Sequence, residues 1–132
     1  MQRRKRGFTI IELLVVLVLI AILVSLAVTR YHSVRDASLV ASATADLDLV
    51  RKVLAYYSVD HESFPSVVTS YDDLKNQMVD LEGNPYGRLP ISNTYAWVSY
   101  TLNSDSNYEI RVQVTDRNRT VLIATPDAVE RQ

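Results

Sequence analysis

The sequence predicts an α+β fold in which a long N-terminal helix packs on a three-stranded antiparallel sheet. Two patterns support this prediction. No glycine or proline occurs from Phe8 to Phe64, and the apolar residues there form first a continuous run and then a helical stripe. The last third of the chain instead alternates apolar and polar residues, which is typical of strands with one buried face. A chain of 132 residues allows one domain, and the lack of cysteine leaves no basis for disulfides or thiol chemistry.

The first half of the predicted helix has the length of a membrane-spanning segment. Four cations at positions 3–6 and Gly7 precede residues 8–28, which are almost entirely apolar. At about 1.5 Å per residue this run is roughly 31 Å long, close to one bilayer hydrocarbon core. The cations favour a cytoplasmic leader and therefore a C-terminal part outside the cytoplasm. Glu12 is a carboxylate inside the run, and a buried charge of this kind predicts a function.

The second half of the helix, residues 30–59, is predicted to be amphipathic. Apolar residues recur there at steps of three and four, so they form one stripe along the helix. The stripe comprises Val40, Ala43, Leu47, Val50, Leu54 and Tyr57. We expect the helix to end near Val59 and the stripe to cover the apolar face of the sheet.

Residues 60–93 are predicted to connect the helix to a sheet at 94–125. Ser70 to Asp73 has the pattern of a capping box that opens a short helix through Met78 or Val79, with Leu74 and Met78 facing inward. Strands are expected at 94–102, 108–115 and 120–125, with a turn at 103–106 between the first two. The tail, 126–132, is expected to be exposed. The predicted inward residues are Ala96, Val98, Tyr100 and Leu102 in the first strand and Tyr108, Ile110, Val112 and Val114 in the second.

Gly7, followed by Phe8-Thr9-Ile10-Ile11-Glu12 and the apolar run, resembles the class III signal of type IV prepilins and type II secretion pseudopilins. The resemblance implies that prepilin peptidase cuts after Gly7 and methylates the new amino terminus at Phe8. Residues 1–7 would then be a cleaved leader, residues 8–29 the transmembrane and filament-core helix, and residues 30–132 a soluble head with the pilin-like α/β roll.

The same resemblance implies a structural subunit of a type IV pilus-like filament, or alternatively a pseudopilin of a type II secretion system. Such a protein would be anchored in the inner membrane until an assembly platform extrudes it into an extracellular or periplasmic filament. Its partners would be prepilin peptidase, the bilayer, that platform, and copies of itself and other pilins. No enzymatic activity, cofactor or metal is expected.

Glu12 is the predicted assembly residue. Cleavage after Gly7 would create an ammonium group at Phe8, four residues before Glu12 and therefore on the same helix face. In lipid the carboxylate needs a partner. That partner is either Phe8 of the same chain or Phe8 of a neighbouring subunit, and the second option would guide axial register. Gly7 has no side chain, so the backbone there can enter a tight protease cleft.

The chain departs from the family pattern at two helix positions. Many pilins have a proline 17 residues beyond the glutamate and a glycine nine residues beyond it, whereas this chain has Thr29 and Ala21. Both family residues weaken a helix. We therefore expect a straighter and less extensible helix here.

Three other interpretations fit part of the N-terminal pattern. A cleaved secretory signal peptide would have a shorter apolar stretch and a small-residue cleavage site. An ordinary single-pass anchor would carry Glu12 at the membrane interface. A solitary membrane-anchored binding module would remain monomeric and retain its leader.

Catalytic and nucleic-acid functions find little support in the sequence. His32 and His61 lie far apart, and the consecutive Asp60, His61 and Glu62 point in different directions, so a metal site is not expected. Without the leader, ten basic residues remain against 15 acidic ones, which gives no basic field for nucleic acid. A glycosylation sequon begins at Asn118, but it is a short match at chance frequency.

Overall fold

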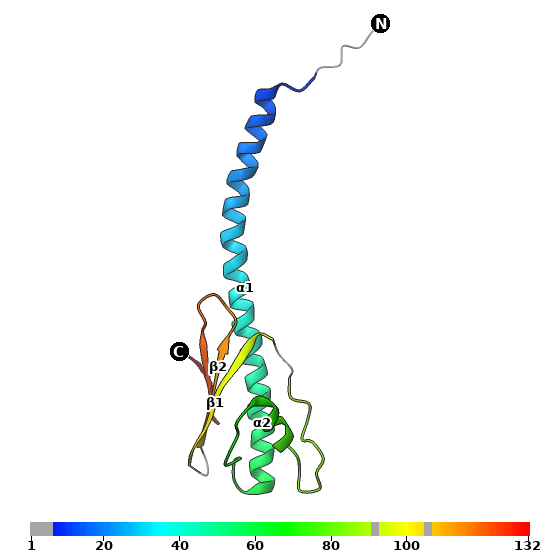
Figure 1. Ribbon diagram of the computed structural model, residues 1–132, viewed down its shortest axis with the longest axis vertical. Helices are drawn as coiled ribbons and strands as arrows, with labels where there is room; N and C mark the ends of the chain where they lie inside the picture. The colour runs from blue at the N-terminus through cyan, green and yellow to red at the C-terminus, as the bar shows by residue number, and fades with distance from the viewer. Residues whose placement is uncertain (1–6, 91–92, 105–106) are drawn as a thin grey trace. The chain divides into compact units, whose positions relative to one another are not determined.

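A computed structural model describes residues 7–90, 93–104 and 107–132, except for the side chain of Ser104 (Figure 1). The chain divides into two compact units, one ending at Arg35 and the other comprising Asp36–Gln132, here called the head. Residues 1–6 of the predicted leader (1–7) and part of the predicted turn at 103–106 lie outside the described residues.

Helix α1 runs from Ile10 to His61 and is the longest element of the chain. It is helical through both Ala21 and Thr29, as the absence of glycine and proline predicts. The Thr29 hydroxyl donates to the Ser25 carbonyl at 3.3 Å, so this polar side chain is satisfied within the helix. The helix ends two residues later than predicted, where Glu62 adopts a left-handed conformation with φ 58°.

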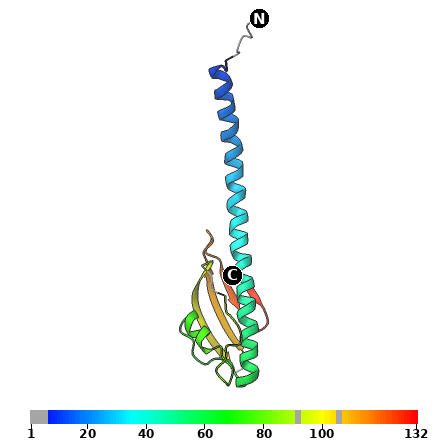
Figure 2. The ribbon, with the colours of Figure 1, turned by 90° about the vertical axis from the view of Figure 1, so that its right-hand side faces the viewer.

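The apolar stripe on the second half of α1 forms one side of the head's core, as predicted. Ala43, Leu47, Val50 and Leu54 are buried, whereas Val40 and Tyr57 are partly buried against the same core. The sheet lies alongside this part of the helix (Figure 2). Val53 is also buried, because the face of α1 that packs on the rest of the head is wider than the predicted stripe.

The sheet is an antiparallel meander of four strands in the order β1-β2-β3-β4, not three strands as predicted. Its strands are β1 (Tyr95–Ser104), β2 (Asn107–Val114), β3 (Val121–Ala124) and β4 (Val129–Arg131). The fourth strand was predicted as exposed tail. A turn folds that tail back on β3, with the Thr125 nitrogen donating to the Ala128 carbonyl at 2.9 Å. Three residues are too few to show the period of two that identifies a strand.

Strand β1 contains a β-bulge that makes half of its predicted inward face wrong. Trp97 pairs with Val112 and Ser99 pairs with Arg111, which leaves Val98 as the extra residue. The inward residues are therefore Tyr95 and Trp97 before the bulge and Tyr100 and Leu102 after it, while Ala96 and Val98 are exposed. In β2, which has no such interruption, Tyr108, Ile110, Val112 and Val114 are all buried as predicted.

Helix α2 (Tyr71–Gln77) begins at the predicted capping box. The Ser70 hydroxyl accepts from the Asp73 nitrogen at 3.1 Å, and the Asp73 carboxylate accepts from the Thr69 nitrogen at 2.8 Å. The Thr69 backbone hydrogen bond also holds the pKa of Asp73 below its usual value. Leu74 and Met78 are buried, as predicted.

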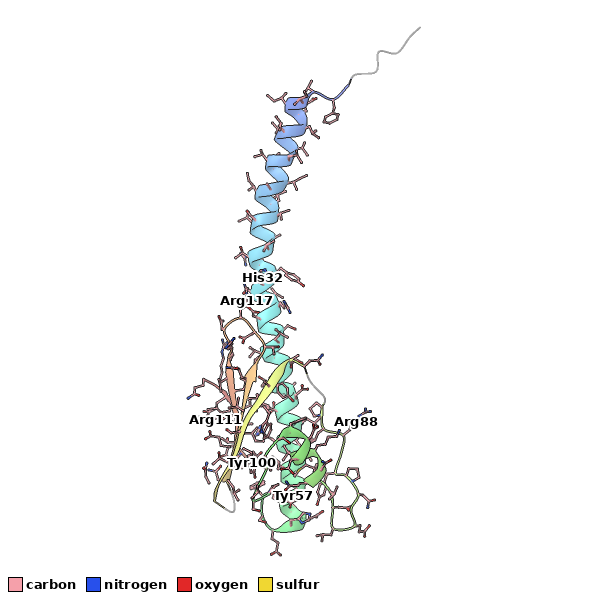
Figure 3. All side chains as sticks on the ribbon, viewed as in Figure 1. His32, Tyr57, Arg88, Tyr100, Arg111 and Arg117 are labelled. Carbon is pink, nitrogen blue, oxygen red and sulfur yellow. The ribbon has the colours of Figure 1, made fainter. Side chains whose placement is uncertain are left out.

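Two arginines connect α1 to the turns before and after β3. Arg51 donates to the carbonyl oxygens of Thr125 and Pro126, each at 2.7 Å, and also to Asp48. Arg117, in the turn between β2 and β3, donates to Asp36 at 3.0 Å (Figure 3). Because these contacts lie before and after β3, they fix the register of that strand along the helix.

Candidate processing and assembly site

The predicted processing site lies at the start of α1. Thr9 is the residue before the first helical residue, Ile10, and its hydroxyl accepts from the Glu12 nitrogen at 3.3 Å. Its carbonyl accepts from the Leu13 nitrogen at 3.3 Å. These contacts make Thr9 the N-cap of the helix and Glu12 its third residue.

The Glu12 carboxylate completes a capping box with Thr9. One carboxylate oxygen accepts from the Thr9 nitrogen at 2.9 Å and from the Thr9 hydroxyl at 2.8 Å. Among the described residues, Thr9 donates both hydrogen bonds that this carboxylate accepts, and Phe8 donates none. In the unprocessed chain the Phe8 nitrogen is an amide without charge, so the predicted pairing with Glu12 stays a prediction about the processed form.

Thr9 was not among the predicted site residues. The signal was present in the sequence, because Thr9-Ile10-Ile11-Glu12 has the spacing of a capping box just before an apolar run.

Gly7 is not required by packing in the described structure. A Cβ atom built at this position has no heavy atom within 4 Å. A larger side chain is therefore compatible with the fold of the rest of the chain.

The apolar surface that follows the site is exposed throughout. The 18-residue window of α1 with membrane-like composition has none of its residues buried, unlike a core helix of a globular protein. An open groove on the helix is lined by Phe8, Ile11, Glu12, Val15 and Val16, so the carboxylate borders the apolar surface. A continuous apolar surface of this size needs lipid or other protein surfaces to cover it.

His61 and Asp60, at the C-terminal end of α1, contact other parts of the head. The His61 ring stacks on Tyr57 with centroids 4.1 Å apart, and its Nε2 lies 3.1 Å from the Val79 carbonyl. Asp60 accepts from the Tyr86 hydroxyl at 2.6 Å. Within the described ranges, no three His, Asp or Glu side chains are grouped to hold a metal ion.

The fold and this site define a class of protein. Its members have a small α+β head and an exposed N-terminal helix of membrane-spanning length, and a carboxylate caps the start of that helix. Comparison with known proteins agrees. Residues 2–28 match the family described as the prokaryotic N-terminal methylation motif. The chain is 30% identical over 125 residues to the type II secretion system core protein G of Pseudomonas aeruginosa, with 80% of this chain and 88% of that protein covered.

Two further relatives match shorter regions. The type II secretion system core protein G of Aeromonas hydrophila is 30% identical over 76 residues, covering 58% of this chain and 53% of that protein. The type IV narrow pilus major component PilA5 of Thermus thermophilus is 38% identical over 63 residues, covering 48% and 54%. No solved structure matches the chain significantly. The chain belongs to the family of type IV pilins and type II secretion pseudopilins.

Proposed function

We propose that this protein is a structural subunit of a type IV pilus-like filament, without enzymatic activity of its own. The observation that carries the proposal is the fully exposed apolar first part of α1, in which Glu12 caps the start of the helix five residues after Gly7. Prepilin peptidase would remove residues 1–7 and methylate Phe8. Residues 8–29 would then span the inner membrane, and residues 30–132 would lie outside the cytoplasm as the head.

Assembly transfers the apolar helix from lipid to the same helices of neighbouring subunits. Moving one Leu, Ile or Val side chain out of water is favourable by roughly 1.5 to 3 kcal/mol. Both the lipid and the filament keep this apolar surface away from water. The gain on leaving lipid is smaller, because lipid tails are as apolar as these side chains. We therefore propose that specific polar contacts, rather than apolar burial alone, select the position of each incoming subunit.

Glu12 is the group proposed to make that selection. After processing, its carboxylate can pair with the Phe8 ammonium of its own chain or of a neighbour. The Thr9 hydrogen bonds fix the direction of the carboxylate in either case. An assembly platform in the inner membrane would supply the movement out of lipid.

A type II secretion pseudopilin is the second candidate. The observation that favours it is coverage: the alignment to the Pseudomonas secretion protein spans 88% of that protein, whereas the alignment to the Thermus pilin spans 54%. Both candidates share the same processing and assembly chemistry.

Deletion of the gene in its own host tests the function and separates the candidates. A pilus subunit predicts loss of sheared surface filaments with normal protein secretion. A pseudopilin predicts that substrates of the secretion system accumulate in the periplasm while surface filaments remain. Unchanged filaments and unchanged secretion, with the protein monomeric in wild-type membranes, would contradict both candidates and favour a solitary membrane-anchored module.

A further inference from the structure

Four side chains form a polar cluster on α1 directly after its apolar segment. Arg30, Tyr31, His32 and Arg35 occupy fewer than two turns of the helix, at the level that Figure 3 marks with His32. Both arginines and Tyr31 are exposed, and His32 is partly exposed. The rings of Tyr31 and His32 meet edge to face, with centroids 5.9 Å apart. We call these four residues the juxtamembrane cluster.

The juxtamembrane cluster carries a net positive charge. No aspartate or glutamate occurs between Glu12 and Asp36, so the segment that holds both cluster arginines contains no carboxylate. The ion pairs formed among the described residues involve other arginines, namely Arg51, Arg111 and Arg117. Two uncompensated guanidinium groups therefore remain at this level of the helix.

Asp36, the first acidic residue after the cluster, is paired with a different arginine. Its carboxylate lies 3.0 Å from the guanidinium nitrogen of Arg117, and only 19% of its side chain is exposed. Asp36 and Arg117 neutralise each other, so Asp36 does not cancel the charge of Arg35. This contact leaves Arg35 available to an anion from outside the chain.

The cluster arginines lie at the height where a bilayer has its phosphate groups. From Phe8, α1 rises on the order of 33 Å to Arg30 and 40 Å to Arg35. The hydrocarbon core of a bilayer is about 30 Å thick, and the headgroup regions extend it to about 40–45 Å. The helix is continuous through this region, and helical side chains lean back toward the N-terminus. Both guanidinium groups would therefore lie between the edge of the hydrocarbon and the outer headgroups.

The positive charge of the cluster is unexpected at this end of the membrane segment. Lysine and arginine favour the cytoplasmic side of a span, and the four cations at positions 3–6 assign the N-terminal end to that side. The cluster would then lie at the outer surface of the inner membrane, against the usual charge bias. Two unpaired arginines at this disfavoured position motivate a binding role.

Arg35, Tyr31 and His32 share one face of the helix. At about 100° per residue, Tyr31 lies about 40° and His32 about 60° from Arg35 around the axis. The guanidinium, the phenol hydroxyl and an imidazole N–H are all hydrogen-bond donors, and a guanidinium can bind two phosphate oxygens at once. Arg30 lies about 140° from Arg35, so it faces a different neighbour.

We propose that the juxtamembrane cluster binds the phosphate groups of anionic phospholipids in the outer leaflet of the inner membrane. Arg35, Tyr31 and His32 donate to one phosphate, and Arg30 donates to a second. Anionic lipids are preferred because a zwitterionic headgroup already carries a cation beside its phosphate. The site rests on the proposed membrane position of residues 8–29, and it fixes the depth of the unassembled subunit in the bilayer.

An acidic protein surface is the other partner with complementary charge. Lipid fits the structure better, because the cluster follows the apolar segment on the same continuous helix. Its two arginines also face different directions, as lipids surrounding a single helix require. One acidic protein surface would cover only one of these directions.

Native mass spectrometry of the full chain tests the site, with equal amounts of phosphatidylglycerol and phosphatidylcholine added to the detergent micelle. Both lipids contain a phosphate, but only phosphatidylglycerol has a net negative charge. The wild type should retain phosphatidylglycerol preferentially. The variant Arg30→Gln/Arg35→Gln should lower the ratio of bound phosphatidylglycerol to phosphatidylcholine on the order of tenfold, since one arginine near an anionic surface favours binding roughly fivefold.

The matched control is Lys52→Gln/Arg88→Gln, which removes the same charge from exposed positions of the head. This variant should keep the wild-type lipid ratio. All variants are compared in the same processing state, because the leader cations would also attract anionic lipid. Loss of the lipid preference in the control as well would show that net charge, not the cluster, sets the preference.

Solid-state NMR in phosphatidylglycerol bilayers tests whether the contact is direct. Lipid phosphorus should dephase guanidinium nitrogen signals in the wild type that are missing from the Arg30→Gln/Arg35→Gln spectrum. Inorganic phosphate should displace no more phosphatidylglycerol than chloride at the same ionic strength. Specific displacement by inorganic phosphate would identify a site for free anions and overturn the lipid assignment.

The outcomes separate the lipid site from the filament function. An equal lipid ratio in the wild type and the arginine variant overturns the site while leaving the filament function in place. An unchanged lipid ratio with a lower ratio of filament to membrane pool would assign the cluster to a protein partner and likewise overturn it. A wild-type protein recovered in the soluble fraction instead of the membrane contradicts the proposed function before any variant is compared.

Discussion

The carboxylate of Glu12 accepts two hydrogen bonds from Thr9, one from the backbone nitrogen at 2.9 Å and one from the hydroxyl at 2.8 Å. In return, the Thr9 hydroxyl accepts from the Glu12 nitrogen. Thr9 thus positions the group that we propose selects each incoming subunit, and Glu12 is oriented before any second subunit arrives.

Thr9→Val should weaken assembly. The substitution preserves the size of the side chain but removes the hydroxyl that donates to the Glu12 carboxylate and accepts from the Glu12 nitrogen. Loss of an N-cap side chain costs about 1 kcal/mol, so a several-fold lower ratio of filament to membrane pool is expected. The measurement is quantitative immunoblotting of sheared and membrane fractions. Thr9→Ser keeps the hydroxyl and serves as the control. Equal loss in both variants would mean that the hydroxyl does not act through Glu12.

Glu12→Ala should be processed normally and assemble poorly. Removing a charge-assisted contact in a low-dielectric environment should reduce filament yield on the order of tenfold or more. Glu12→Gln separates charge from hydrogen bonding, since it keeps the shape but cannot pair with an ammonium. Abundant filaments made of the alanine variant alone would refute a role for Glu12 in register.

Gly7→Leu should block removal of the leader without altering the head. The position has open space around it, so the larger side chain meets no neighbour in the folded chain. Gel mobility of the membrane form should show the unprocessed length, while resistance of the head to limited proteolysis should match the wild type. Processed protein from this variant would contradict cleavage by a peptidase that requires glycine.

Arg51→Met should destabilise the head by about 2 kcal/mol, because the substitution leaves two carbonyl oxygens without their donor. Those oxygens belong to Thr125 and Pro126, in the turn that leads into β4. Urea unfolding of the full chain in detergent can be followed through Trp97, the one tryptophan of the chain. Lys52→Met changes an exposed neighbour equally in charge and should have little effect. Matching midpoints for the two variants would show that Arg51 does not hold the turn.

The head should lose stability at alkaline pH through its buried tyrosines. Burial raises the pKa of Tyr108 to about 12, well above its ordinary value near 10. A raised pKa in the folded state means that the stabilisation is complete below pH 10 and is lost as the pH rises through 12. Tyr108→Phe keeps the ring packed against Phe64, at a centroid distance of 4.7 Å, and removes this titration. Its unfolding midpoint should therefore fall less between pH 9 and 11 than that of the wild type. An identical fall would show that Tyr108 does not contribute to the pH dependence.

The helices and the central strand could be predicted because their signals are long and periodic. The stripe from Val40 to Tyr57 spans several turns, and the alternation in β2 continues for four buried residues without interruption. Capping chemistry gave the start of α2 correctly at Ser70. These elements depend on local patterns that a single sequence displays.

The features that could not be predicted depend on contacts between distant residues. The bulge at Val98 changes which residues of β1 face inward, and only pairing with β2 reveals it. Strand β4 forms because a turn returns the tail to β3, beside the contact of Arg51 with that turn. The stacking of His61 on Tyr57 and the Tyr86 contact with Asp60 likewise join segments that the sequence separates.

The processing of Phe8 remains the central claim, because the Glu12 pairing and the release of the helix from lipid both follow from it. Intact mass spectrometry of the protein extracted from its native membrane tests it most directly. The prediction is a species that begins at Phe8 and carries one additional methyl group. A species that retains Met1 to Gly7 without methylation would contradict the prepilin pathway and the proposed filament assembly with it.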